Sequence, residues 1–356
     1  MAARAGGWSG LTDPAFWHGR RVWLTGHTGF KGAWLALWLQ SLGAEVHGFS
    51  LDCVSEPSLY EVAGVGDGMA GDVRGDVRSA GEVRAAVARA RPAVVIHLAA
   101  QALVRRGLAK PVETFTVNVT GTANVLEAVR AESDARAVVV ATSDKCYRND
   151  GRGIPFREDD PLGGEDPYSA SKAAQELVAA AYRGLGLPVA TVRAGNVIGG
   201  GDWAPDRLVA DCMRAALAGE PLAVRAPDAI RPWQHVLCPL DGYLRVAERL
   251  WEDGDAARAW NFGPAEADAR PVGWLVERVR ERWPGPLEIA PAAAGAADGE
   301  APRLRLDSAQ ARERLGWAPR WDLEAGLDAT VSWYAGYRDG ADMRARTLAQ
   351  IAAFSA

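Results

Sequence analysis

Cysteines are few in this sequence, and none are spaced as a metal site or a disulfide framework requires. The 356 residues include four cysteines, all far apart and without a Cys-x-x-Cys pair. Such pairs are what structural zinc sites and small secreted scaffolds use. His, Cys, Asp and Glu residues nowhere group at metal-ligand spacing. We therefore expect no bound metal and a reducing, cytoplasmic environment.

Long apolar runs and an excess of positive charge are missing too. No run approaches the roughly 18 apolar residues that span a bilayer, and the N-terminal stretch lacks the apolar segment of a signal peptide. The formal net charge is −5, so nothing favours a polyanion such as nucleic acid. These absences predict a soluble protein with a small-molecule substrate and with neither membrane nor nucleic acid as a partner.

From residue 21 onward the sequence alternates short β-branched runs with longer stretches of helical period. The predicted strands are 21–26, 45–52, 93–100, 137–143 and a run from 188, and the predicted helices between them are 30–44, 80–90, 114–131 and 169–186. This order is typical of an α/β fold, a doubly wound parallel sheet of the Rossmann type with crossover helices on both faces.

Past residue 200 the pattern loosens into long loops and separate helices. We predict a larger domain over residues 1–195, which also receives 229–262, and a smaller C-terminal lobe formed mainly by 196–356 above the carboxyl edge of the sheet. The small-residue stretch 291–302 is expected to be a surface loop.

The stretch "TGHTGFKG" places three glycines, Gly26, Gly29 and Gly32, between the first predicted strand and its helix. Without side chains there, the backbone can turn tightly and a pyrophosphate can approach the amides at the helix N-terminus. Asp52 lies 20 residues beyond Gly32, at a strand end where its carboxylate suits a ribose hydroxyl and repels a 2′-phosphate. The motif predicts that the larger domain binds NAD rather than NADP.

Three residues near this motif have two interpretations each. His27 and Lys31, inside the loop, either contact the pyrophosphate or lie at the loop surface. Asp76 either reaches the adenine or only marks the start of a helix.

Tyr168 and Lys172 in "YSASK" are four residues apart at the start of a predicted helix, so both project from one face. A tyrosine is a poor base at neutral pH, but an ammonium beside it stabilises the phenolate and lowers its pKa. This pair suits an enzyme that removes a proton from a sugar hydroxyl while the carbon is oxidised. Ser143, at the end of a predicted strand, is positioned to hydrogen-bond the same oxygen.

Together these motifs resemble the extended short-chain dehydrogenase/reductase superfamily. More narrowly, the sequence resembles the CDP-glucose 4,6-dehydratases from about residue 16 to about residue 337, in "GHTGFKG", "HLAAQALVRR", "TSDKCY", "DPYSASK", "RAGNVIGGGDWAPDRL" and "RPWQHVL". The resemblance implies that Phe30, Leu98, Ala99 and Ala100 join the cofactor contacts.

The same resemblance implies a lyase of deoxysugar biosynthesis, such as that of lipopolysaccharide O-antigen. It also implies a homodimer or homotetramer, with the two long helices at 112–131 and 169–186 as a four-helix dimer face.

In such an enzyme, C4 of the glucosyl unit is oxidised, water is lost across C5 and C6, and C6 is then reduced, so that no net redox change occurs. The site needs a base for O4, a base for C5 and an acid for the departing hydroxyl. Tyr168 would serve O4. Asp144 and Lys145 fall where the related dTDP-glucose enzymes carry an Asp-Glu pair, which implies that Asp144 is the acid and makes Lys145 a departure from that pattern.

Lys145 has two interpretations. As the base for C5 it must be neutral while Asp144 is protonated, a titration that belongs to the pair. As a cation it would help electrostatically near the nicotinamide or the enolate, and it would weaken NAD+ retention. For Ser143, Asp144 and Lys145 to act together, the strand must end near Ser143, because alternate strand residues point to opposite faces.

At the substrate end, the amide of Asn196 could bond the sugar or its phosphates. Arg207 and Arg231 offer guanidinium groups suited to a diphosphate, or salt bridges between lobe and sheet. Arg105, with Arg106 beside it, contacts either a substrate phosphate or a partner subunit.

Two other functions use the same fold. A sugar-nucleotide 4-epimerase shares the glycine motif and the Tyr168–Lys172 pair but has no use for Asp144 and Lys145. An NAD-sensing regulator that lost its chemistry would be expected to lack Tyr168 or Lys172, and both are present. The sequence therefore favours a CDP-glucose dehydratase, with a dehydratase for another nucleotide hexose as the alternative.

Overall fold

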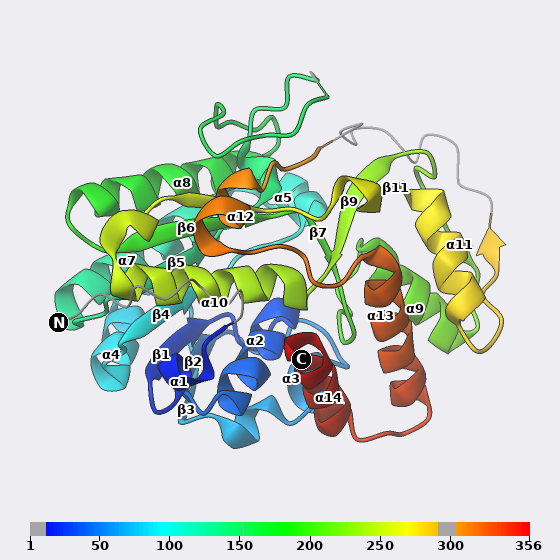
Figure 1. Cartoon of the computed structure of the whole chain (residues 1–356), viewed down its shortest axis with the longest axis horizontal. Coiled ribbons are helices and arrows are strands. Elements are labelled where there is room, and N and C mark those ends of the chain that lie inside the picture. Colours follow the sequence, from blue (N-terminus) through cyan, green and yellow to red (C-terminus); the bar gives the residue numbers. More distant parts are fainter. Residues whose placement is uncertain (1–11, 152, 291–303) are drawn as a thin grey trace.

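The computed structural model describes residues 12–151, 153–290 and 304–356, and the loop expected at 291–302 lies outside them. The centre of the molecule is a sheet of seven parallel strands in the order β10-β6-β5-β4-β1-β2-β3 (Figure 1). These strands are β1 (Arg21–Thr25), β2 (Glu45–Ser50), β3 (Gly71–Arg74), β4 (Val94–His97), β5 (Ala137–Ala141), β6 (Val189–Ala194) and β10 (Ala259–Phe262). The predicted fold class, an α/β doubly wound parallel sheet, is confirmed.

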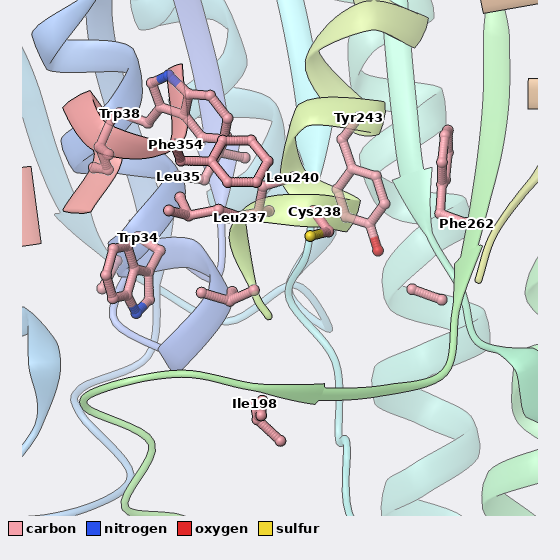
Figure 2. Close-up of a cluster of buried hydrophobic side chains, with 14 of the residues drawn as sticks. Trp34, Leu35, Trp38, Ile198, Leu237, Cys238, Leu240, Tyr243, Phe262 and Phe354 are labelled. Carbon is pink, nitrogen blue, oxygen red and sulfur yellow. The ribbon is translucent and has the colours of Figure 1, made fainter. Parts of the chain in front are cut away.

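Helices cover both faces of this sheet, because successive strand residues are buried on opposite sides. In β1, Val22 and Leu24 pack into one hydrophobic cluster, and Trp23 packs into the other. The first cluster includes α2 (Phe30–Ser41) and α10 (Leu237–Glu252), and the second includes α4 (Ala80–Ala90), α7 (Gly121–Glu132) and α8 (Pro167–Gly184). Figure 2 shows side chains of α2, α10 and α14 (Met343–Ser355) meeting in the first cluster. With both faces buried, the carboxyl ends of the strands are left for a ligand.

A smaller group of elements follows β6. Its sheet has the order β11-β9-β7, and a two-stranded sheet pairs β12 with β8. The bounds are β7 (Asn196–Ile198), β8 (Leu222–Ala223), β9 (Ile230–His235), β11 (Ala269–Pro271), β12 (Ile289–Ala290), α9 (Leu208–Ala218), α11 (Val272–Arg282) and α13 (Leu323–Arg338). The chain returns to the large sheet through α10 and β10, α12 (Ala309–Leu315) packs on β10, and α14 packs against α2.

Short helices complete the described chain, and some predicted boundaries prove wrong for local reasons. These helices are α1 (Pro14–Trp17), α3 (Leu59–Val62), α5 (Val104–Ala109) and α6 (Pro111–Phe115). The helix expected at 30–44 ends at Ser41, because Gly43 turns the chain with φ +77°. The helix expected at 114–131 begins already at Pro111 and passes through a π-turn before α7. Strand β3 has no apolar run because it is a half-exposed edge strand, which is why its sequence predicts only an irregular segment.

Candidate active site

The loop after β1 has a shape that requires glycine at two positions. Gly26 has φ +75°, and a Cβ there would lie 2.7 Å from the backbone nitrogen of Ala99. A Cβ on Gly32 would lie 2.0 Å from the carbonyl oxygen of Gly26. Gly29 is the N-cap of α2, which begins at Phe30, so the loop presents the free amides of a helix N-terminus at the edge of the sheet. This cradle fits the pyrophosphate of a dinucleotide.

The chain that leaves β4 lies directly beside this loop. The backbone amides of Leu98 and Ala99 donate to Thr25 Oγ1 at 3.2 and 3.1 Å, and Ala100 follows them. A side chain on Gly26 would collide with this same segment. The structure therefore brings the three predicted residues after β4 to the glycine loop.

An open cavity of about 400 Å³ lies at the end of β2. It is lined by Asp52, Cys53, Val54, Ser55, Glu56, Tyr60, Glu61 and Arg74. The Asp52 carboxylate is largely exposed, and Arg74 Nε lies 3.3 Å from it. Asp76, the other acidic candidate, forms an ion pair with Arg78. The size and acidic wall of this cavity fit the adenosine half of NAD.

His27 is not at the loop surface. Its ring is fully buried, and Nε2 lies 2.8 Å from Asp72 Oδ1 of β3 and 3.0 Å from Arg74. The edge of the ring packs against Tyr60. Burial lowers the pKa of His27, although Asp72 opposes this change. The surface interpretation of His27 was wrong, because the ring ties the glycine loop to the edge strand.

Lys31 is only partly exposed, and its charge interacts with residues of the carboxyl edge. It is half-buried, and burial together with the nearby Arg207 lowers its pKa to about 8. Asp144 and Lys145 also act on its charge. Its ammonium therefore belongs to the charged cluster at the carboxyl edge, although the sequence gives no sign of this position.

The turn after β5 gathers three candidate residues. β5 ends at Ala141, Ser143 is still extended, and a short 3-10 turn follows from Asp144 to Cys146, so the extended alternation stops at Ser143. Ser143 Oγ donates to Asp144 Oδ1 at 2.9 Å and accepts the backbone N–H of Lys145 at 3.2 Å. Lys145 Nζ lies 3.6 Å from Asp144 Oδ1. Asp144 is 2% exposed, and its Oδ2 has no hydrogen-bond partner among the described residues.

Helix α8 brings Tyr168 and Lys172 to the same edge. Asp166 caps the helix by accepting from the backbone of Tyr168, and Pro167 starts it. Both side chains are buried, and Lys172 Nζ donates to the Ala141 carbonyl at 3.4 Å. Burial lowers the pKa of Lys172 to about 7, with help from the charge of Lys31.

The electrostatics of Tyr168 differ from the sequence expectation. Burial raises the pKa of Tyr168 above its ordinary value. Lys145 and a hydrogen bond with Ser143 oppose this shift, and Lys145 is the strongest of the opposing charges. The prediction that Lys172 lowers the pKa of Tyr168 was wrong. The lysine that acts most strongly on the phenol is Lys145, from the turn after β5.

A buried ion pair links β6 to α8 next to the turn that follows β5. Arg193 of β6 meets Glu176 of α8 at 2.8 Å, and both side chains are almost fully buried. Arg193 also donates to the hydroxyl of Tyr147, which in turn donates to Asn261 of β10 at 2.7 Å. Tyr147 directly follows the 3-10 turn, so the pair fixes the end of that turn to α8 and to two strands. Sequence reasoning missed these residues, since a buried ion pair has no periodic signal.

The remaining candidates lie where the large sheet meets the smaller lobe. Asn196 is half-buried at the start of β7. Arg207 Nη1 lies 3.0 Å from the buried Asp202, and the charge of Tyr168 acts on Arg207. Arg231, in β9, donates to the carbonyl of Ile230 at 3.1 Å. Arg207 is therefore tied electrostatically to Tyr168.

Two arginines converge on a single carboxylate in the loop before α9. Arg105 of α5 and Arg225 approach Asp206 Oδ1 at 3.5 and 3.0 Å. Asp206 has φ +63°, which residues other than glycine rarely adopt. Arg106 pairs instead with Glu113 of α6. Arg225 is an additional cation that no sequence motif indicated.

Comparisons with known proteins agree with this geometry. Residues 22–263 match the NAD dependent epimerase/dehydratase family. The chain is 44% identical to a CDP-glucose 4,6-dehydratase of Salmonella typhimurium, over 94% of this chain and 95% of that protein. It is 29% identical to a dTDP-glucose 4,6-dehydratase of Xanthomonas campestris pv. campestris, over 88% and 93%.

The solved structures show the same fold. A UDP-glucose 4-epimerase of Thermus thermophilus, solved in complex with NAD, superposes with a TM-score of 0.76 at 26% identity and covers 89% of this chain and 99% of its own. The glycine cradle, the adenosine-sized cavity and the family match lead to one conclusion. The chain belongs to the NAD dependent epimerase/dehydratase family.

Proposed function

We propose that this protein is an NAD-dependent CDP-glucose 4,6-dehydratase, a hydro-lyase that converts CDP-glucose to CDP-4-dehydro-6-deoxyglucose and water. The similarity to the Salmonella typhimurium enzyme supports the substrate. The observation that carries the reaction is the Asp144 carboxyl, which is buried beside Lys145 and Tyr168 and has one oxygen without a hydrogen-bond partner in the described part of the chain. A 4-epimerase, although similar in fold, has no use for such an acid beside its tyrosine.

Each step has a residue suited to it. Tyr168, close to Ser143, removes the proton from O4, and Ser143 orients that oxygen. NAD, when bound, supplies the two-electron oxidation at C4 and its later reversal at C6. The 4-ketone acidifies the C5 hydrogen, which Lys145 removes. Asp144 then gives its proton to the departing C6 hydroxyl.

Lys145 acts as the C5 base in this proposal rather than only as a cation. Its side chain is 37% exposed, so water can reach it, and its Nζ lies 3.6 Å from Asp144 Oδ1. The alternative electrostatic role predicts no effect on removal of the C5 proton, so the two can be separated.

The cofactor and substrate are assigned to different segments. We assign NAD to the glycine loop, to Phe30 and Lys31, to Asp52 and Asp76, to residues 98–100 and to the Tyr168–Lys172 pair. The sugar nucleotide is assigned to Asn196, Arg105, Arg207 and Arg231, because guanidinium groups bind diphosphates well. The domain division follows, with residues 1–195 and 229–262 for NAD and 196–356 mainly for substrate.

We further propose a homodimer, or a tetramer built from it. Four exposed large apolar side chains, Leu108, Val112, Phe115 and Leu177, lie on α5, α6 and α8, which pack side by side. Such a patch is typical of a protein interface. No helix in the described part of the chain could span a membrane, and we propose a cytoplasmic role in deoxysugar biosynthesis, such as that of O-antigen.

A panel of substrates tests the nucleotide preference. The protein is incubated with CDP-, dTDP-, GDP- and UDP-glucose, and the 4-keto product is followed by its absorbance in strong alkali. We expect CDP-glucose to be converted with the highest kcat/KM. Faster conversion of another nucleotide would assign the enzyme to that hexose instead, and conversion of none would contradict the proposed function.

A further inference from the structure

The proposed reaction shifts protons unevenly between two residues of the site, and the present inference rests on that proposed function. Oxidation at C4 breaks the O4–H bond and leaves its proton on Tyr168. Elimination breaks the C6–O bond, and the departing hydroxyl takes the proton of Asp144 to become water. Lys145 takes one proton from C5 and gives one proton back to C5 when C6 is reduced, after its ammonium protons have exchanged with solvent. Each turnover therefore ends with an extra proton on Tyr168 and a missing proton on Asp144.

The structure contains a direct path between these two groups through Ser143. Its Oγ donates to Asp144 Oδ1 at 2.9 Å and accepts the backbone N–H of Lys145 at 3.2 Å. The phenol of Tyr168 lies close enough to Ser143 for this hydroxyl to lower the pKa of the phenol. A serine hydroxyl has one donor and two acceptor positions. The donor is directed at Asp144 and one acceptor position at Lys145, so one acceptor position is left for the phenol.

Other routes for the proton are less direct. Tyr168 is 7% exposed and Asp144 is 2% exposed, so neither exchanges freely with solvent. The second carboxylate oxygen of Asp144 has no hydrogen-bond partner among the described residues. Lys145 lies 3.6 Å from Asp144 and is partly exposed. However, Lys145 must stay protonated until C6 has been reduced, so it cannot recharge Asp144 during that time.

We propose that Ser143 relays the proton from Tyr168 back to Asp144 once in every turnover. The Oγ–H proton of Ser143 passes to Asp144 Oδ1 while the phenolic proton of Tyr168 passes to Ser143 Oγ. Two O–H bonds break and two form, no electrons are transferred, and all three residues return to their starting states. The proton that is removed from O4 thus becomes the proton of the water that leaves in the next turnover.

The relay is tested by comparing Ser143→Ala with Ser143→Thr, which keeps a hydroxyl at this position. We expect steady-state turnover of CDP-glucose by Ser143→Ala to fall by about 100-fold. At constant pH this slow rate should rise in proportion to the concentration of a small acid such as formic acid or imidazolium, which can protonate Asp144 from solution. Turnover by Ser143→Thr and by the wild type should not depend on the buffer concentration. A turnover rate of Ser143→Ala that does not change with the concentration of these acids would overturn the relay.

A measurement on the wild type gives an independent test. A pH-indicator dye in weak buffer follows protons during the first turnover after rapid mixing with CDP-glucose. An internal relay predicts no transient release of a proton to solvent, and release of one proton per site followed by its uptake would overturn it. If the wild type forms no 4-keto sugar at all, the proposed function fails. If the wild type is active but the turnover rate of Ser143→Ala does not depend on the concentration of the small acid, only the relay is refuted.

Discussion

Three lysines lie at the candidate active-site edge of the sheet, and the fold gives each a different environment. Lys172 is buried, with its pKa lowered to about 7, and Lys31 is half-buried, with its pKa lowered to about 8. Lys145 is partly exposed and lies beside Asp144. Two of the three side chains can therefore lose a proton near neutral pH. Because Lys172 and Lys31 can be neutral, the three lysines need not all carry a positive charge at the same time.

The role of Lys145 is testable through one hydrogen atom. Lys145→Ala should slow exchange of the C5 hydrogen of the product with deuterated solvent by about 100-fold, because the base for C5 is gone. The exchange is followed by proton NMR. Lys110→Ala, which removes an exposed lysine of a surface ion pair, is the control and should exchange at the wild-type rate. Undiminished exchange in Lys145→Ala would leave Lys145 as an electrostatic group.

Burial of Lys172 gives a pH dependence of stability with a defined sign. Its folded-state pKa of about 7 lies below the ordinary 10.5, so the unfolded chain binds more protons between these values. Its contribution to the free energy of unfolding therefore rises with pH through this window. Below about pH 7 the folded protein carries the full cost of burying the charged ammonium. At about pH 7, the free energy of unfolding of Lys172→Met, measured by urea titration, should exceed that of the wild type by about 2–4 kcal/mol. Most of this gain should be lost at about pH 10, and equal stability of the two proteins at both pH values would contradict the assignment.

At the scale of elements, the turns after strands position the chemistry. The loop between β1 and α2 folds back so tightly that Gly32 contacts the carbonyl of Gly26, and the turn after β5 is closed by the Ser143 hydroxyl. Both turns lie at the carboxyl edge, where the parallel strands end together. The large sheet thus brings residues that are far apart in the sequence into one site.

Two glycines of the same loop should respond differently to alanine. Gly32→Ala places a Cβ 2.0 Å from the carbonyl of Gly26, so we expect a loss of about 1–3 kcal/mol in the free energy of unfolding. At Gly29 the nearest atom would be 3.4 Å away, so Gly29→Ala should cost less than about 1 kcal/mol. Urea unfolding without NAD checks both. Equal losses would mean that the loop relaxes around Gly32.

The sequence predicted the larger elements well because their signals are local. The glycine spacing and the Tyr168–Lys172 spacing depend on neighbours within one turn, and periodic burial marks the main strands and helices. Lys31 shows the limit, since its position beside Arg207 depends on how α2 packs against the lobe. The pair Arg193–Glu176 and the edge strand β3 were equally invisible, because neither has apolar periodicity.

At the scale of the whole molecule, one sheet serves two groups of elements. The chain leaves the large sheet after β6, builds the smaller sheets, and returns through α10 and β10 (Figure 1). Arg207 of the smaller group thereby comes close enough to Tyr168 and Lys31 for their charges to interact. On α5, α6 and α8 the exposed apolar patch remains, and a second copy of the chain would bury it.

The assembly is tested by placing a charge in this patch. Leu177 is 63% exposed on α8, and Leu177→Glu should shift the molar mass measured by light scattering from dimer toward monomer, since buried like charges at a symmetric interface repel. Ile289→Glu, which changes an exposed apolar residue of β12, is the matched control and should keep the wild-type mass. A monomeric wild type would contradict the proposed dimer.

The most direct test of the proposed reaction is to incubate the protein with CDP-glucose and NAD+ in deuterated water and identify the product by mass spectrometry and NMR. The proposal predicts a CDP-sugar that has lost one water, carries a keto group at C4 and a methyl group at C6, and holds one deuterium at C5. A product that keeps all its oxygen atoms and differs only in configuration at C4 would contradict it and identify an epimerase.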